Sequence, residues 1–201
     1  ISYDQNFDFA IDVKNTELIT DVLFPKLSKF DPGEIKGSYN SIEKKLDLNF
    51  HVPIIGYKKM LFDSVVFTAT SDPDMFRYSL AAAEIKDSIF YLNHLLLKGD
   101  VQDNVLSSRL ILEDTASTEK YHFGGKLTQQ DEALVFRFFD DGLKFNYEQW
   151  QLPKNHYLQF GKQGFKTDNF VLTNDSQQLK LDTNDDDLQV MFSEFQLKAL
   201  S

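Results

Sequence analysis

The sequence predicts an all-β fold, built around a curved antiparallel sheet with one apolar face, and one short helix near the N-terminus. Apolar and polar residues alternate in run after run along the chain, which is the period of a strand with one buried face. Clusters of Asp, Asn, Gly and Pro separate these runs, and these residues favour turns. Segments that could serve as crossover helices are missing, which excludes a parallel α/β fold.

The first 30 residues predict one strand and the single helix. The strand is indicated by apolar residues that alternate with polar ones, at Phe7, Phe9, Ile11 and Val13. Asn15 or Thr16 can cap a helix that runs to about Phe24, and Pro25 ends it. Its apolar stripe consists of Leu18, Val22 and Leu23. A helix this short must lie on other structure to persist, so we expect residues 1–30 to form a lid over one end of the sheet.

Residues 31–201 predict repeated β-hairpins in one continuous domain. Alternation is clearest over 35–39, 46–52, 62–70, 76–86, 106–112 and in short runs from residue 145 to residue 197. A helix at 81–84 is an alternative, but a strand over 78–86 continues the alternation of apolar and polar residues better. Residues 89–97 are apolar on both faces in places, which indicates either a strand covered on both sides or a strand whose apolar face switches. At common strand lengths, roughly ten to thirteen strands fit in the chain.

A hairpin unit recurs at an offset of 88 residues. The first copy contains Ile35, Gly37, Tyr39, Leu46, Leu48 and Phe50, and the second contains Phe123, Gly125, Leu127, Leu134, Phe136 and Phe138. A third copy with a tighter turn runs from Leu97, Gly99 and Val101 to Leu106, Leu110 and Leu112. Glycine inside a strand often marks a bulge or a bend, so we expect these glycines to curve the sheet.

The apolar face of the repeated hairpin needs a cover. A sheet with one apolar face curls on itself, pairs with a second sheet or holds an apolar ligand. Filling a core is the commonest use of such a face, and a trough for acyl chains is the alternative. If a trough forms, the candidates for its lining are the paired apolar residues of the two hairpins, Leu46, Leu48, Phe50, Leu134, Phe136 and Phe138.

Composition excludes several classes of function. The formal net charge of −10 argues against nucleic acid and against anionic lipid headgroups, because both require clusters of Lys and Arg. The chain has no Cys, which excludes disulfides and thiolate zinc sites and leaves the compartment open. No run of residues is long and apolar enough to span a membrane. Because the chain starts at Ile1, we expect it to be a piece of a longer protein, with any membrane anchor outside it.

Motifs for catalysis or metal binding are weak, and we expect no enzyme activity and no cofactor. His51, His94, His122 and His156 lack metal-ligand spacing, and we expect them at solvent-facing or turn positions. The acidic runs 140–141 and 185–187 precede strands, where Asp forms turns. Residues 182–193 begin like an EF-hand loop, but Asp187 replaces the required Gly and Ser193 the required Glu. The run 124–126 lacks the context of a phosphate-binding loop.

Near the C-terminus the sequence contains an ordered constellation of residues: Tyr147, Trp150, Leu152, Pro153, Asn155, Tyr157, Leu158, Phe160, Gly164, Phe165, Asn169, Phe170, Leu172, Gln177, Leu179, Leu188, Val190, Phe192, Phe195 and Leu197. In this constellation most strongly, and from Gly37 to Leu197 as a whole, the chain resembles the TamB family of AsmA-like envelope proteins, Bacteroidetes-type. The family ends this stretch with Asn-Phe-x-Leu, where this chain has Glu194 before Phe195. We expect the strand of residues 188–197 to lie at a sheet edge.

The resemblance implies a non-catalytic periplasmic segment of a long protein. It implies an elongated, half-open β-taco, which is an antiparallel sheet curled around an apolar lumen. The anchor would lie in the inner membrane, outside this chain, and the partner would be an Omp85-type outer-membrane protein. The implied roles are outer-membrane protein assembly or secretion and the movement of phospholipid, through its acyl chains, between the membranes.

Two other functions remain open from the sequence. The first is a protein-binding module that holds client β-strands at an exposed sheet edge. The second is a glycan-binding β-sandwich, which as an enzyme would require two carboxylates that face each other across a cleft. The direction of the apolar side chains, into an open trough or into a closed core, discriminates most directly among these hypotheses.

Overall fold

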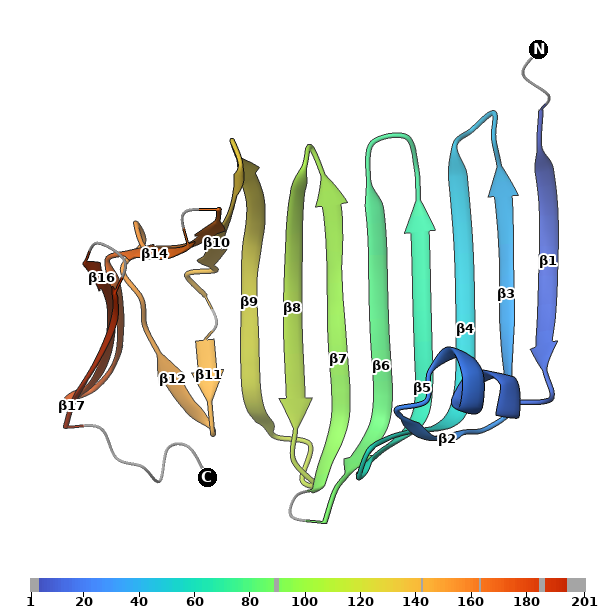
Figure 1. Ribbon diagram of the computed structural model, residues 1–201, viewed down its shortest axis with the longest axis horizontal. Helices are drawn as coiled ribbons and strands as arrows, with labels where there is room; N and C mark the ends of the chain where they lie inside the picture. Colours follow the sequence, from blue (N-terminus) through green and yellow to red (C-terminus); the bar gives the residue numbers. More distant parts are fainter. Residues whose placement is uncertain (1–3, 89–90, 142, 163, 185–186, 195–201) are drawn as a thin grey trace. The chain divides into compact units, whose positions relative to one another are not determined.

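The computed structural model describes residues 4–88, 91–141, 143–162, 164–184 and 187–194. These residues are almost entirely antiparallel β-structure with one short helix, which confirms the predicted all-β class (Figure 1). The chain divides into two compact units: unit 1 is residues 1–103 with 112–118, and unit 2 is residues 104–111 with 119–201. The N-terminal strand and helix, expected as a separate lid, belong to unit 1, and the expected domain of residues 31–201 is divided between the units.

Unit 1 is built on an open antiparallel sheet of long strands in the order β1-β3-β4-β5-β6-β7, and β2 pairs with β4. The elements are β1 (Asn6–Val13), helix η1 (Leu18–Leu23), β2 (Leu27–Phe30), β3 (Gly33–Asn40), β4 (Lys45–Tyr57), β5 (Met60–Ser71), β6 (Phe76–Lys86) and β7 (Tyr91–Gln102). The segment 78–86 is therefore a strand, as preferred over a helix. Ile89, which the sequence places in the next strand, lies outside the described residues.

The register places the apolar residues of unit 1 on one face. One row of directly opposed residues consists of Ile11, Ile35, Phe50, Phe67, Leu80 and Leu97. A second row consists of Phe7, Tyr39, Leu46, Ser71, Phe76 and Val101. Opposed side chains project from the same side of a sheet. The rows of Asp47 and Asn49, which alternate with the apolar rows, project from the other side and are mostly polar. We call the first side the apolar face of unit 1.

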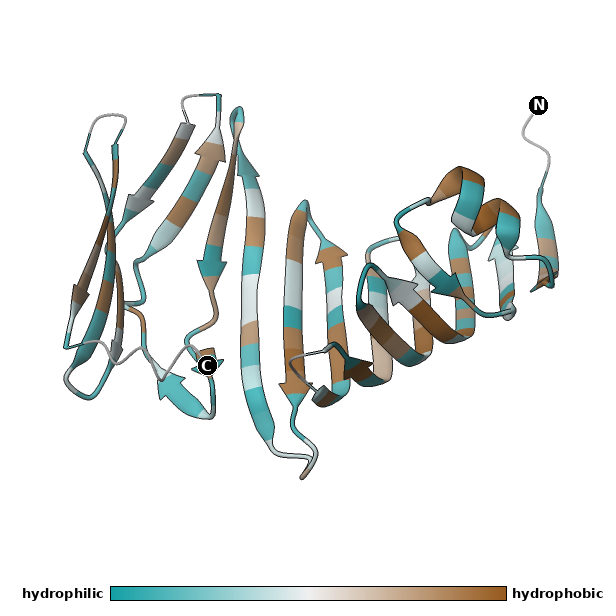
Figure 2. Cartoon of the chain, turned by 60° about the horizontal axis from the view of Figure 1, so that its bottom comes forward, coloured by the Kyte–Doolittle hydropathy of each residue, from teal (hydrophilic) through white to brown (hydrophobic). Residues whose placement is uncertain are grey.

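A line of irregular residues crosses β4 to β7 and changes the alternation. The bridges pass from Val52–Val65 to Ile54–Asp63, so Pro53 and Ser64 stay unpaired between them. In the same way Ala83 and His94 stay unpaired between β6 and β7. Ser64 and His94 both have φ of 52°, which non-glycine residues adopt rarely. As a consequence, two apolar residues on either side of this line share a face when they are three positions apart in the strand, instead of two. Apolar segments gather at these strand ends (Figure 2).

No bulge lies at Gly37, one of the strand glycines for which the sequence predicts a bulge or a bend. The pairing of β3 with β4 runs without interruption through Gly37, which opposes Leu48. A Cβ atom at Gly37 would lie 2.5 Å from Cζ of Phe9 and 2.7 Å from the carbonyl oxygen of Asp47. In unit 2, a Cβ at Gly125 would lie 2.4 Å from Cζ of Phe136. Each glycine is therefore the place where an aromatic ring from a neighbouring strand covers the backbone.

The helix η1 is shorter than predicted and its apolar stripe is exposed. The side chain of Asn15 accepts a hydrogen bond from the N–H of Glu17 at 3.0 Å, but the N-cap residue is Glu17, without a side-chain capping hydrogen bond. Leu18, Val22 and Leu23 are 61%, 66% and 59% exposed. A lid would bury these side chains on the sheet, so the stripe does not make the contact that the sequence analysis expected.

Unit 2 contains two small sheets and part of β8 (Val105–Glu113), of which residues 105–111 belong to this unit. Its first sheet pairs β9 (Glu119–Gln130), β10 (Ala133–Phe138), β13 (Tyr157–Gly161) and β14 (Gly164–Asp168), with the hairpin of β11 (Leu143–Phe145) and β12 (Glu148–Trp150) beside β9. The second sheet consists of β15 (Phe170–Asn174), β16 (Gln177–Asn184) and β17 (Asp187–Ser193) in that order. A bridge between Gln151 and Thr173 connects the two sheets.

The core of unit 2 forms around Trp150, the single tryptophan. Trp150 and Leu143 are buried and pack against Phe123, Phe138, Phe145, Leu152 and Leu172. His156 is only 1% exposed. Its Nε2 accepts a hydrogen bond from the backbone N–H of Phe138 at 2.9 Å, and its Nδ1 donates to the carbonyl of Pro153. The sequence analysis expected His156 at a solvent-facing or turn position, but it is a buried core residue.

The repeated hairpin is present in both units with a difference in register. Gly37 opposes Leu48, whereas Gly125 opposes Phe138 and not Phe136, its counterpart at the 88-residue offset. The reason lies in the turn: Asn40 pairs with Lys45, but Gln130 pairs with Ala133 around a tight Asp131-Glu132 turn. The third copy also forms two strands, β7 and β8, which flank Asp103 and Asn104 with φ of 51° and 59°.

Replacement of Gly37 by alanine is expected to destabilise the protein by about 1–3 kcal/mol, because the new methyl group overlaps the Phe9 ring and the Asp47 carbonyl. The exposed neighbour Lys36 is the matched control, and Lys36→Ala is expected to change stability by less than about 0.5 kcal/mol. Urea unfolding of both variants measures the difference. Equal stability of G37A and the unmodified chain would contradict this packing.

Candidate functional site: the apolar trough of unit 1

The apolar face of unit 1 contains a hollow of about 460 Å³. Strands β4 to β7 supply its lining, which consists of Phe50, Ile55, Phe62, Val65, Phe67, Leu80, Ala82 and Leu95. All of these residues are apolar, and Val65 and Ala82 are buried at its floor. We call this hollow the trough.

The trough is formed at the line where the alternation of the strands changes. Phe67 and Val65 line it from one side of Ser64, and Phe62 lines it from the other side. With regular alternation, Phe62 would project from the opposite face of β5. The backbone at Pro53 and Ser64 therefore brings side chains from both strand segments to one surface.

The chemistry of the trough is limited to hydrophobic contact. A pocket that recognises a polar ligand combines an apolar wall with a few placed polar groups. The lining of the trough has no side-chain donor, acceptor or charge. An alkyl chain fits these properties, because burial of each CH₂ group is worth about 0.8 kcal/mol and requires no hydrogen-bond partner. The absence of a polar group also means that no position along such a chain is preferred.

The six residues predicted from the sequence lie in two different units. In unit 1, Phe50 lines the trough, and Leu46 and Leu48 project from the same face of β4. Leu48 also lines a second hollow of about 710 Å³ beside β1 and β3, where polar residues predominate. The first predicted hairpin thus contributes directly to the candidate site.

The second predicted hairpin lies in unit 2 and is partly used for packing. Phe138 packs against the Trp150 core, and the Phe136 ring contacts it edge-on at a centroid distance of 4.8 Å. Leu134 is 45% exposed and opposes Phe160, which is similarly exposed. The contacts of Phe138 correspond to the core-filling alternative of the sequence analysis, whereas Leu134 contributes to a smaller apolar surface.

Sequence reasoning missed most of the trough lining. The strand over residues 62–70 was predicted, but the face to which Phe62 contributes depends on the unpaired Ser64. One signal was Pro53 at the end of an alternating run, since proline interrupts regular pairing in a strand. A second signal was the alternative of a switched apolar face within residues 89–97, which contain Leu95 of the lining.

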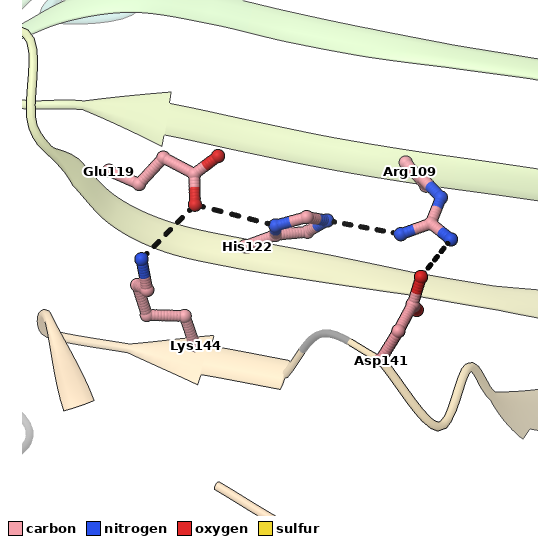
Figure 3. A network of polar contacts seen from close by, with 5 residues as sticks. All are labelled: Arg109, Glu119, His122, Asp141 and Lys144. Carbon is pink, nitrogen blue, oxygen red and sulfur yellow. Dashed lines mark hydrogen bonds and ion pairs between the residues drawn. The ribbon is translucent and has the colours of Figure 1, made fainter. Parts of the chain in front are cut away.

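Unit 2 contains a chain of polar contacts that the sequence did not indicate (Figure 3). The ammonium group of Lys144 lies 3.2 Å from Oε2 of Glu119, and that oxygen lies 3.5 Å from Nδ1 of His122. On the other side, Nε2 of His122 lies 3.4 Å from Arg109, whose guanidinium donates to Asp141 at 2.8 Å. The five side chains come from β8, β9, β11 and the segment after β10.

The electrostatics of this network are those of ion pairs. The hydrogen bond and charge of Lys144 lower the pKa of the Glu119 carboxyl, and Arg109 lowers the pKa of Asp141 in the same way. Arg109 lies on the Nε2 side of the His122 ring, and Glu119 lies on its Nδ1 side. Within the described part of the chain, no group of three or more His, Asp or Glu residues could hold a metal ion.

Comparisons with protein-family models, with curated proteins and with solved structures gave no match. The resemblance to the TamB family therefore stays a prediction from the sequence motifs. Among the described residues, no helix is long and apolar enough to cross a membrane.

The lowered pKa of Glu119 predicts an acid-dependent loss of stability. A carboxyl with a depressed pKa in the folded state stabilises the fold above its unfolded pKa of about 4.3, and this contribution is lost as the pH falls through the lower, folded pKa. Replacement of Lys144 by methionine removes the cause of the shift. We expect the loss of stability below about pH 4 to be smaller in K144M than in the unmodified chain.

Chemical unfolding between pH 6 and pH 3 measures this difference. Lys162→Met is the matched control, because the ion pair of Lys162 with Glu132 is almost fully exposed and such pairs contribute little. An identical pH dependence of K144M and the unmodified chain would show that the Lys144–Glu119 pair does not act on stability.

Proposed function

We propose that this chain is a non-catalytic segment that holds the acyl chains of phospholipid in the trough of unit 1 and lets them slide along it. The observation that carries the proposal is the open hollow of about 460 Å³ with a completely apolar lining. Rows of apolar residues extend from it over six strands, from Ile11 on β1 to Leu97 on β7. An acyl chain that leaves the trough along these rows keeps part of its surface out of water.

Hydrophobic contacts in the trough would retain an acyl chain without fixing it at one position. Each buried CH₂ group contributes about 0.8 kcal/mol, so several of them retain a chain that is insoluble in water. A shift by one CH₂ group exchanges one set of apolar contacts for an equivalent set. The barrier to sliding is therefore small, which is the property that a conduit requires.

The resemblance to the TamB family supplies the setting that we propose. The chain would be a periplasmic part of a longer protein with an inner-membrane anchor elsewhere and an Omp85-type partner at the outer membrane. Its roles there would be phospholipid movement and outer-membrane protein assembly or secretion. The support for this setting is the ordered motif from Tyr147 to Leu197, of which Phe195 and Leu197 lie outside the described residues.

Photo-crosslinking tests the occupancy of the trough. A photoreactive phenylalanine analogue at Phe50 faces the trough, whereas the same analogue at the adjacent Asn49 projects from the polar face of β4. On irradiation in bacterial cells, we expect a phospholipid adduct at position 50 that is at least ten-fold more abundant than at position 49. Mass spectrometry of the purified chain measures both. Adducts at neither position, or at both equally, would contradict the proposal.

The exposed edge strand β17 favours a second candidate function. Among the described residues this strand lies at the edge of its sheet and pairs with β16 alone, and all seven of its residues are exposed. Leu188, Val190 and Phe192 project from one side and are 49%, 47% and 59% exposed. Unpaired backbone groups beside exposed apolar side chains are a template for another strand. The edge could hold a client β-strand during outer-membrane protein assembly.

A proline at Val190 separates this second function from the first. Val190 opposes Leu181 at a position of the ladder where its N–H faces the open edge, so the substitution removes an outward donor and adds a ring there. We expect V190P to lose at least ten-fold in affinity for a client β-hairpin peptide in a fluorescence titration. Retention of phospholipid, by contrast, is expected to be unchanged, because β17 contributes no residue to the trough. Unchanged peptide binding by V190P would exclude the edge as a client site.

A further inference from the structure

A cationic hollow of about 410 Å³ lies on the face of the β9–β10 hairpin opposite Leu134 and Phe136. Four cationic side chains line it, against only two aspartates: Arg109, Lys126, Arg137, Lys154, Asp140 and Asp141. The chain as a whole has a net charge of −10. The lining of the hollow is therefore positively charged, whereas the chain as a whole is negatively charged.

Two of these cations are opposed without compensation. Lys126 and Arg137 are directly opposite each other in the register of β9 and β10, and so project from the same face. Like charges in this position destabilise a sheet. Among the described residues, no carboxylate forms an ion pair with either side chain, and the recorded contact of the Arg137 guanidinium is with the Tyr157 ring at 5.6 Å. Folding alone gives no reason for this arrangement.

The neighbouring cations already have partners and a fixed position. Arg109 lies across Gly124, where a Cβ would be 2.9 Å from its Cγ. Its guanidinium stacks on the Phe139 ring at 4.4 Å and donates to Asp141 (Figure 3). Lys154 lies 3.9 Å from Asp140. Both aspartates are thus engaged, and the unmatched positive charge is that of Lys126 and Arg137.

We propose that this hollow binds a phosphate group, held between Lys126 and Arg137. A phosphomonoester carries close to two negative charges at neutral pH, which matches the two unpaired cations. The planar guanidinium of Arg137 presents two donors in the spacing of phosphate oxygens, and Lys126 adds a point charge. The site lies on the polar face of β9–β10, and it does not depend on the proposed function of the trough.

Thermal unfolding in the presence of inorganic phosphate, at constant ionic strength, tests the proposal. Phosphate is expected to raise the Tm of the unmodified chain, because a ligand that binds only the folded state stabilises it. In K126Q and R137Q the apparent affinity for phosphate, from the concentration dependence of Tm, is expected to fall at least ten-fold. Without phosphate, K126Q is expected to be no less stable than the unmodified chain, since it relieves the repulsion.

Lys162→Gln is the matched control, because it removes one charge from the same unit at an exposed ion pair. It is expected to change the phosphate affinity less than two-fold. A Tm that rises no more with phosphate than with chloride, or a K126Q variant that responds like the unmodified chain, would overturn the proposal.

A second measurement distinguishes a lipid headgroup from a soluble phosphate. Sedimentation with phosphatidylcholine vesicles that contain phosphatidic acid, lost in K126Q, would support the site and assign the phosphate to a lipid. Binding of inorganic phosphate without vesicle binding would support it with a soluble ligand. Failure of both probes contradicts the site and leaves the trough proposal unaffected, because lipid retention at Phe50 uses different residues.

Discussion

An antiparallel sheet whose strands are apolar on one side has to remove that side from water, and unit 1 has almost nothing with which to cover it. Six long strands carry the apolar rows, while the single helix spans only six residues and leaves its own apolar stripe exposed. A packed helical layer is the usual cover in mixed folds. Here the sheet reduces the exposed area itself, because β4 to β7 bring apolar side chains from both sides of an irregular line to one hollow.

The glycines and the irregular residues have separate roles in this solution. Gly37 and Gly125 lie in regular parts of their strands, where the missing side chain lets a phenylalanine ring lie on the backbone. Pro53, Ser64, Ala83 and His94 form the line at which the alternation changes. The rings of Phe9 and Phe136 can take these positions because the residue beneath each of them has no Cβ. The trough depends on the irregular line and not on the glycines.

The predictable part of this structure is the local part. Alternation and turn residues are properties of neighbouring positions, and they were sufficient for the all-β class, the β3–β4 and β9–β10 hairpins and the strand over residues 78–86. The trough was predicted only through Phe50 and its neighbours, because the face of Phe62 depends on backbone angles at Ser64. Phe138 lies in a core because of Trp150 and His156, which are distant in the sequence, and Arg109, His122 and Asp141 meet for the same reason. No pattern within a single strand contains that information.

If the apolar face of unit 1 is an occupied lipid site, as we propose, and not an exposed remnant of packing, the purified chain retains phospholipid. Native mass spectrometry of the chain, purified from bacterial cells without detergent, tests this most directly. We expect a series of adducts with the masses of phospholipids. These adducts should be lost in Phe67→Asp, in the trough, and retained in Thr68→Asp, on the other face of the same strand. A spectrum that contains only the bare chain, even after incubation with phospholipid, would contradict the proposal.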